Sequence, residues 1–351
     1  MKVLIETTPL QTTRAGVARY VRNLLLGLRA AGPADIQVAE IGWRMENHGY
    51  AQPFRAMKTL AREWGWAKWV APWELRGAGV LHHTHLPLIP FRRPTRHVVT
   101  LHDLALLRYP ERFRPWQRHT GIRRLTRLAR ADRIICVSRF TADEAIRLLG
   151  LPAGRLEVVH NGVEALAAGA DGALPAGVPA EFFLFLGSLE PGKNLSLLAQ
   201  AWQLAAEAGR RLPPLVVVGD RWAGVPRETT PPAGWVYLGF QTDAVVEALL
   251  QRAQALLFPS LYEGFGYPVV EAMRAGCPVV CGRVASLPEI GGDAALYADL
   301  DPAAFLAAIR HLEDDPGLAA DLVRRGLVQS AVFTLARCAE ETLAVYRETM
   351  A

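Results

Sequence analysis

The chain has 351 residues, of which 51% are hydrophobic and 21% are charged. This composition is that of a globular protein long enough for two domains, and it excludes a disordered chain. No apolar run approaches the roughly 20 residues that span a bilayer, and the acidic start at Met1–Glu6 does not have the form of a signal peptide. We therefore expect a cytoplasmic protein.

Short apolar runs alternate with helical patterns along the chain. Continuous apolar strands separated by helices are typical of a parallel sheet covered on both faces, and they indicate an α/β, doubly wound fold. An Ala/Gly/Pro-rich stretch at 166–180 is typical of a linker between two similar halves, 1–165 and 181–330, and a helical pattern at 331–351 ends the chain. The strands that we predict are 3–5, 36–39, 97–101, 133–137, 156–159, 182–186, 215–218, 255–258 and 278–281.

The first half carries histidines that are candidates for a binding site. His102 and Asp103 follow a predicted strand, and the carboxyl ends of strands line the binding crevice of open α/β sheets. A lone histidine is most often structural, but this position favours a functional one. His82, His83 and His85 are residue types that bind zinc. Because neither cysteine nor acid lies near them in sequence, we assign them to the edge of a binding cleft.

The net charge of +5 is concentrated in one block. Between Arg108 and Arg133, nine arginines stand against two acids, and Trp116 and Ile122 interleave with them. Such a block is most often the solvated face of an ordinary helix. The alternative is contact with an anionic membrane, which would place the protein peripherally on the inner membrane face. Nucleic acid is not an expected partner, because no helix-turn-helix, zinc-finger or RNA-binding signature accompanies the charge.

Two other local patterns indicate helix starts. Thr141 and Glu144 have the spacing of a capping box. Asp299 and Asp301 have the D-x-D form of a metal site, but Asp301 precedes a proline and a helical pattern, so we interpret it as a helix N-cap. The cysteines form no C-x-x-C pair, which is typical of reduced, buried thiols. They are Cys136, Cys277, Cys281 and Cys338.

The most informative segment is Glu263–Glu271. Gly264 and Gly266 let the backbone approach a ligand closely, and Pro268 is suited to the first position of a helix. Glu271 then falls in the first helical turn, near free backbone amides that bind anions. Two carboxylates beside a helix N-terminus suit a nucleotide sugar, which has hydroxyls around a phosphate core. The alternative is a glycine turn before a surface helix.

Taken in order, motifs of both halves resemble those of the retaining glycosyltransferases of family 4. The resemblance implies a GT-B fold, in which two Rossmann-like, doubly wound parallel-sheet domains face each other across a cleft. The first domain would bind the acceptor and the second the nucleotide sugar, and the final helix would return to the first domain. The resemblance covers nearly the whole chain and is carried by Thr12–Tyr20, Thr100–Leu104, Cys136–Glu144, Gly187–Asn194 and Glu263–Glu271.

The resemblance implies catalytic roles for His102, Lys193 and Glu263. His102 and Glu263 would hold the transferred sugar, and Lys193 would stabilise the charge of the leaving diphosphate. Ser188 stands where the family commonly has an arginine that binds phosphate, so Arg221 is our candidate for the replacement cation.

Further donor and acceptor residues follow from the same resemblance. Glu271 would accept hydrogen bonds from the ribose hydroxyls. The donor-binding residues in full would be Gly16, Ser188, Lys193, Arg221, Glu263, Gly264, Phe265, Gly266 and Glu271. The acceptor-side candidates are Arg14, His82, His85 and Asp103.

We therefore predict a retaining hexosyltransferase that needs neither metal nor cofactor. Its donor would be a nucleotide diphosphate sugar of the GDP or UDP type, and its acceptor a glycan or a lipid-linked glycan. A mannose-like sugar is favoured, because Gly187–Asn194 resembles mannosyltransferases of surface-polysaccharide assembly. Two alternatives remain: a nucleotide-sugar epimerase of the same fold, and a non-catalytic nucleotide-binding subunit.

Overall fold

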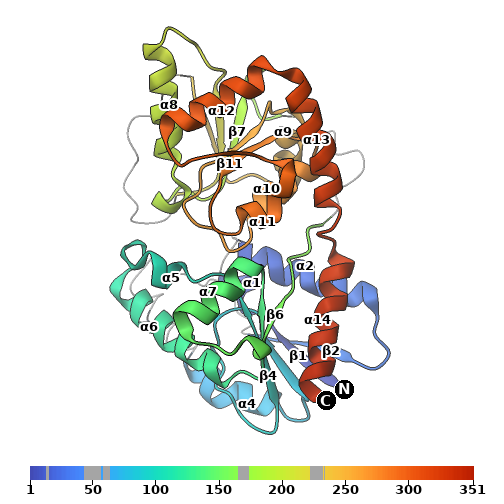
Figure 1. Ribbon diagram of the computed structural model, residues 1–351. Helices are drawn as coiled ribbons and strands as arrows, with labels where there is room; N and C mark the ends of the chain where they lie inside the picture. The colour runs from blue at the N-terminus through green and yellow to red at the C-terminus, as the bar shows by residue number, and fades with distance from the viewer. Residues whose placement is uncertain (13–15, 43–56, 58–63, 165–173, 222–231, 233) are drawn as a thin grey trace. The chain divides into compact units, whose positions relative to one another are not determined.

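The structure is a computed structural model that describes residues 1–12, 16–42, 57, 64–164, 174–221, 232 and 234–351 (Figure 1). The chain divides into two compact units. One unit is formed by Met1–Glu164 together with Thr334–Ala351, and the other by Ala165–Phe333. Each unit contains a parallel sheet, and the described part of each sheet has six strands.

The first unit is a parallel sheet with helices packed on it. Its elements are β1 (Lys2–Glu6), α1 (Pro9–Thr12), α2 (Gly16–Ala31), β2 (Gln37–Ile41), η1 (Trp66–Val70), α4 (Ala71–Glu74), β3 (Val80–His83), β4 (Arg96–Leu101), α5 (Ala105–Arg108), η2 (Pro110–Arg112), α6 (Pro115–Leu125), η3 (Thr126–Arg130), β5 (Arg133–Cys136), α7 (Arg139–Leu149), η4 (Ala153–Arg155), β6 (Leu156–Val158) and α14 (Leu335–Met350). The strand order is β2-β1-β3-β4-β5-β6. The order reverses between β1 and β3, and ligands bind at such a switch point in open α/β sheets.

The second unit repeats this plan. Its elements are β7 (Phe183–Leu186), η5 (Pro191–Lys193), α8 (Leu195–Glu207), β8 (Leu215–Val218), β9 (Val236–Gly239), α9 (Asp243–Arg252), β10 (Leu256–Phe258), α10 (Tyr267–Arg274), β11 (Val279–Gly282), α11 (Leu287–Gly291), η6 (Gly292–Ala294), β12 (Leu296–Ala298), α12 (Pro302–Asp314) and α13 (Pro316–Ser330). The strand order is β12-β11-β10-β7-β8-β9, so the switch point lies between β7 and β10. The two sheets confirm the predicted α/β fold class.

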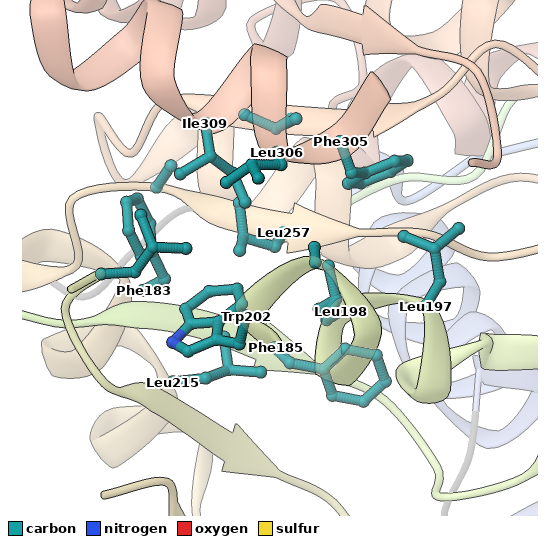
Figure 2. Close-up of a cluster of buried hydrophobic side chains, with 14 of the residues drawn as sticks. Phe183, Phe185, Leu197, Leu198, Trp202, Leu215, Leu257, Phe305, Leu306 and Ile309 are labelled. Carbon is teal, nitrogen blue, oxygen red and sulfur yellow. The ribbon is translucent and has the colours of Figure 1, made fainter. Parts of the chain in front are cut away.

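Both faces of the second sheet are covered by apolar side chains. On one face, α8 and α12 bring Trp202 and Phe305 against Phe183 and Leu257 of the strands (Figure 2). A second cluster includes Leu184 and Phe258, the alternate strand positions, with residues of α9 and α10. Strands buried on both faces read as continuous apolar runs, which is why β7, β8 and β10 were recognisable from the sequence.

Three strands escaped the sequence analysis, and β3 is the informative one. His82 and His83 interrupt its apolar run, yet both are completely buried. Side chains alternate along a strand, so these two histidines point to opposite faces of the sheet. The sequence cluster is therefore divided by the fold. The other two strands that were missed are β9 and β12.

The last helix, α14, packs on the first unit, chiefly against α2. Arg347 donates two hydrogen bonds to Asp35, of 2.8 and 3.0 Å. Within 166–180, Leu174 and Val178 pack against the core of the second unit, while 165–173 lie outside the described residues. Near the end of α14, the Tyr346 hydroxyl lies 2.6 Å from Nδ1 of His82 in β3.

One of the two predicted helix caps is correct. Asp301 caps α12 by accepting hydrogen bonds from the amides of Ala303 and Ala304. The capping box at Thr141 and Glu144 is wrong, because α7 begins three residues earlier. Ser138 lies in extended backbone after β5, and its side chain accepts a 3.1 Å hydrogen bond from the Thr141 amide. Glu144 pairs with arginine side chains instead.

Candidate functional site

Lys193 and Glu263 meet at the switch point of the second sheet. Lys193 ends η5, which follows β7, and Glu263 lies in the loop after β10. Because β7 and β10 are neighbours, their carboxyl ends bring these loops together. The Lys193 ammonium donates to Glu263 Oε1 at 2.5 Å, and the Ser260 hydroxyl donates to the same oxygen at 2.6 Å. Both ionic side chains are partly exposed, so they face a place that solvent or a ligand can reach.

The loop that carries Glu263 is held by buried hydroxyl and amide groups. The hydroxyl of Ser286 lies 2.9 Å from the Glu263 carbonyl oxygen and 3.0 Å from that of Phe265. The Leu261 amide donates to the carbonyl oxygen of Gly192, which joins this loop to η5. Sequence reasoning missed both Ser260 and Ser286. Ser260 follows a predicted strand by two residues and could have been found, but Ser286 is 23 positions from Glu263 and carries no local signal.

Gly266 sets the start of α10. It is the N-cap, its φ is +100°, and a Cβ there would lie 2.8 Å from Leu287 Cδ2. Only glycine adopts this backbone without strain. The helix begins at Tyr267, so Glu271 is its fifth residue and lies in the second turn. Our expectation that Glu271 lies in the first turn is wrong, because the helix starts one residue before Pro268.

Phe265 contributes its backbone to this segment rather than its ring. The side chain is buried, with ring contacts to Tyr267 and Phe333 at centroid distances of 5.2 and 5.5 Å. Gly264 is buried beside it. The loop therefore has an aromatic anchor beneath it.

The segment that holds Ser188 lies beside Arg221. Leu189 and Arg221 form a parallel bridge, and the Leu189 amide donates to the Asp220 carbonyl oxygen at 2.9 Å. Gly219 permits this approach, since its φ is +140° and a Cβ would lie 1.9 Å from the Gly187 carbonyl oxygen. Ser188 and Lys193 thus follow β7, Arg221 follows β8, and these two strands are neighbours in the sheet.

In the first unit, His102 follows β4 and has a defined tautomer. Its Nε2–H donates to the Thr84 carbonyl oxygen at 2.8 Å, and the Tyr20 ring lies edge-on at 4.9 Å between centroids. Burial lowers the pKa of His102, so the imidazole is neutral near pH 7. With the proton on Nε2, Nδ1 is an acceptor for a ligand hydroxyl. Asp103 is exposed, and its carboxylate accepts from the Ala105 amide at 2.9 Å.

His82 has no ring nitrogen to offer a ligand. Its Nδ1 bonds to the Tyr346 hydroxyl and its Nε2 to the Thr100 hydroxyl, at 2.6 and 2.7 Å. This satisfied core histidine is therefore left out of the acceptor side that we propose below. Gly16 is the exposed first residue of α2, whereas Arg14 lies outside the described residues.

His85 and Glu6 differ from His82. Nδ1 of His85 and Oε1 of Glu6 are buried and make no hydrogen bond to any described residue. His85 follows β3 and Glu6 ends β1, and these two strands flank the first switch point. The other oxygen of Glu6 lies 3.3 Å from Nδ1 of His83, whose Nε2 lies 3.1 Å from Nδ1 of His97. Within the described part of the chain, no three His, Cys, Asp or Glu side chains gather in an arrangement able to hold a metal ion.

The arginine block is partly used inside the protein. Arg108 pairs with Glu144 at 2.5 Å, and Arg127 and Arg133 donate to backbone carbonyl oxygens at 3.2 Å. Trp116 and Ile122 remain exposed on α6. Among the described residues, no helix is both long enough and apolar enough to cross a bilayer.

Comparison with known proteins decides the family. Residues 14–165 match the family described as Glycosyltransferase Family 4, and residues 180–315 match Glycosyl transferases group 1. The chain is 31% identical to the O-antigen chain mannosyltransferase B of Escherichia coli, over 99% of this chain and 100% of that protein. The chain belongs to glycosyltransferase family 4. The predicted resemblance is therefore confirmed.

Solved structures show the GT-B fold for this family 4 chain. Sucrose-phosphate synthase from Thermosynechococcus elongatus aligns with a TM-score of 0.74 at 19% identity, over 99% of this chain and 98% of that one. HepE of Anabaena, in complex with UDP and glucose, aligns with a TM-score of 0.69 at 16% identity, over 99% of both chains. At these identities the likeness concerns the fold alone.

Proposed function

We propose that this family 4 glycosyltransferase moves a mannosyl residue from a nucleotide diphosphate sugar to a glycan or lipid-linked glycan in surface-polysaccharide synthesis. The observation that carries the proposal is the contact of Lys193 with Glu263 at the switch point of the second sheet. The name of the Escherichia coli relative, an O-antigen chain mannosyltransferase, supports mannose and this type of acceptor.

The proposed donor site follows from the charges around that contact. The Lys193 ammonium would turn to the diphosphate and stabilise the negative charge that develops there as the sugar departs. Arg221, on the neighbouring loop, would supply the second cation in place of the arginine replaced by Ser188. Backbone amides between Gly264 and Gly266 would meet the sugar or its phosphate.

Carboxylates would then recognise the hydroxyl groups of the donor. Glu263 accepts hydrogen bonds from Lys193 and Ser260 through Oε1, and Oε2 would accept from other donors such as sugar hydroxyls. Glu271, one turn into α10, would accept from the ribose. His102 would accept from the transferred sugar through Nδ1, because Nε2 is engaged by a backbone carbonyl.

The proposed reaction retains the anomeric configuration. The bond between C1 of the sugar and the phosphate oxygen breaks, and the acceptor oxygen bonds to C1 on the same face. The proton of the acceptor hydroxyl passes to the departing phosphate oxygen, so no separate protein base is required. Fixed cationic and amide groups stabilise the leaving group in this proposal, and His85, Asp103 and Arg14 stay candidates for the acceptor side.

Sugar transfer by the purified full chain tests the proposal. GDP-mannose and several UDP- and dTDP-sugars would be compared by thermal shift, because a bound ligand stabilises the folded state. Turnover of Lys193→Ala and Glu263→Ala would then be measured with EDTA present and absent. Arg211→Ala and Glu181→Ala remove exposed charges of the same unit and serve as matched controls.

Each outcome has a defined meaning. Loss of transfer in the two site variants, with both controls active and EDTA without effect, supports the mechanism. Unchanged turnover in both site variants contradicts it. A product with an altered donor sugar and no transfer would identify an epimerase, and nucleotide binding without any turnover would identify a binding subunit.

A further inference from the structure

Three exposed tryptophans of the first unit lie close to one another in sequence. Trp64, Trp69 and Trp73 are each 65% exposed. Indole side chains bury large areas in most proteins, so three exposed ones within ten residues are typical of a contact surface. Val70 is also exposed in this segment.

The opposite side of the same segment is firmly anchored. η1 and α4 bury Trp66, Ala67 and Ala71, and Leu75 follows just after α4. These residues pack in one cluster with Leu4, Ile41 and Leu81 of the strands. The helical turns are therefore held by ordinary core packing. The exposed tryptophans are not a substitute for a missing core, and we call them the tryptophan face, defined as Trp64, Lys68, Trp69, Val70, Trp73 and Arg76.

A cationic side chain lies over each tryptophan ring of this face. The Lys68 ammonium lies 4.4 Å from the centroid of the Trp64 ring and 5.1 Å from that of Trp69. The Arg76 guanidinium lies 3.9 Å from the Trp73 ring centroid. Trp69 and Trp73 are four residues apart along consecutive helical turns, a spacing that places two side chains on the same face.

The chemistry of this face distinguishes two classes of partner. A sugar ring stacks on an open indole and needs nearby carboxylate or amide groups for its hydroxyls. Here cations already lie over the rings, and Glu74 is the one acid within 64–76. A bilayer surface suits the face better. Indoles favour the membrane–water interface, aliphatic groups such as Val70 enter the acyl region, and lysine and arginine meet lipid phosphates.

We propose that the tryptophan face is a membrane-contact surface that binds bilayers with anionic headgroups. The surface is separate in sequence from the arginine block of 108–133, and it would hold the enzyme at the membrane whatever sugar is transferred. Its binding combines insertion of the indoles with attraction of Lys68 and Arg76 to lipid phosphate.

Vesicle sedimentation of the full chain, without any nucleotide sugar, tests this proposal independently of the enzymatic activity. The probes are vesicles of phosphatidylcholine alone and of equal parts phosphatidylcholine and phosphatidylglycerol. The variants are the triple change Trp64→Ser, Trp69→Ser and Trp73→Ser, and the pair Lys68→Gln with Arg76→Gln. Trp116→Ser is the matched control, because Trp116 is an exposed tryptophan on α6, within the arginine block.

The expected result is binding of the wild-type chain to vesicles with phosphatidylglycerol. The triple variant should bind these vesicles at least about tenfold more weakly, because it lacks three apolar groups that would be buried in the bilayer. The charge pair should lose the preference for phosphatidylglycerol, and Trp116→Ser should bind as wild type. Thermal unfolding would verify that each variant is folded.

Four results would overturn the proposal. The first is a wild-type chain that binds neither vesicle. The second is a folded triple variant that binds as strongly as wild type, and the third is a Trp116→Ser variant that abolishes binding by itself. The fourth is binding of a soluble mannose oligosaccharide that the triple variant loses while vesicle binding persists, which would make the face a glycan-binding surface.

Discussion

Lys193 donates a 2.5 Å hydrogen bond to Glu263, a residue 70 positions further along the chain. Between them the chain passes through β8, β9 and β10, but β7 and β10 are neighbours in the sheet, so the loops that follow these two strands meet. The ion pair holds a cation and a carboxylate at the switch point. We propose that a nucleotide sugar separates them, with its phosphates at Lys193 and its hydroxyls at Glu263.

Replacing Lys193 tests the electrostatic part of this arrangement. Lys193→Met keeps much of the apolar stem and removes the charge, so kcat/KM should fall about 10²–10³-fold. Glu263→Gln keeps an acceptor for Ser260 but removes the carboxylate. Since the two side chains contact each other, the double variant should lose less than the sum of the two free energies. Steady-state kinetics of the four proteins measures the coupling, and strict additivity would show that the two groups act independently.

Ser286→Ala should reduce activity without a direct contact to substrate. Its hydroxyl lies against two carbonyl oxygens of the Glu263 loop, and its loss should cost about 1–3 kcal/mol of stability and loosen the loop. We expect kcat/KM to fall about tenfold, because Glu263 then spends less time in place. Ser330→Ala is the control, since among the described residues that hydroxyl bonds to the Leu327 carbonyl oxygen of its own helix, α13, and to no part of the Glu263 loop. Equal kinetic losses in the two variants would argue against a positioning role for Ser286.

Gly266→Ala should impair both stability and donor binding. At a φ of +100° any Cβ is strained, and here it would also lie 2.8 Å from Leu287 Cδ2. The expected loss is about 1–3 kcal/mol, measured by urea unfolding. Gly209→Ala separates the two causes, because Gly209 has a φ of +69° with nothing within 4 Å of the added Cβ. A Gly266 variant no less stable than the Gly209 variant, with full nucleotide affinity, would refute this account of the α10 start.

The buried histidines of the first unit predict acid sensitivity. Burial lowers the pKa of His82 and His83 to about 3 and that of His85 and His97 to about 4. In the unfolded chain these groups titrate near 6.5, so unfolding takes up protons only below that pH. Stability should therefore be constant above pH 6.5 with respect to these groups and fall as the pH drops towards 4. Each extra proton that the unfolded chain binds lowers the free energy of unfolding by about 1.4 kcal/mol for each pH unit of decrease.

Glu6 acts in the opposite direction, since burial raises the pKa of its carboxyl group, but in the first unit it is one group against five histidines, His102 included. Urea unfolding of wild type and His82→Gln between pH 7.5 and 5 measures the effect, and the variant should show a slope smaller by about one proton. His119→Gln, which replaces an exposed histidine, is the control for the substitution itself. A wild-type stability that does not change from pH 7 to 5 would contradict the prediction.

The residues show why some of the fold was predictable and some was not. β8 was predicted with its observed bounds because Leu215–Val218 is an apolar run buried on both faces. The Asp301 cap was predictable because an N-cap depends on its own next three residues. β3 was missed because its buried histidines are made tolerable by distant partners such as Tyr346 and Glu6, which no local pattern reveals.

The sequence by itself determined the α/β class, the glycine turn at Gly266 and the candidates Lys193, Glu263 and His102, because each depends on local periodicity, backbone geometry or a compact motif. Only the tertiary structure decided which of them meet. Strand order brings Lys193 to Glu263 and places Ser286 beneath that loop, whereas the packing of α14 and β4 engages both ring nitrogens of His82. The reason is physical: contacts between residues far apart in sequence are set by the packing of whole elements, and single residues carry no record of it.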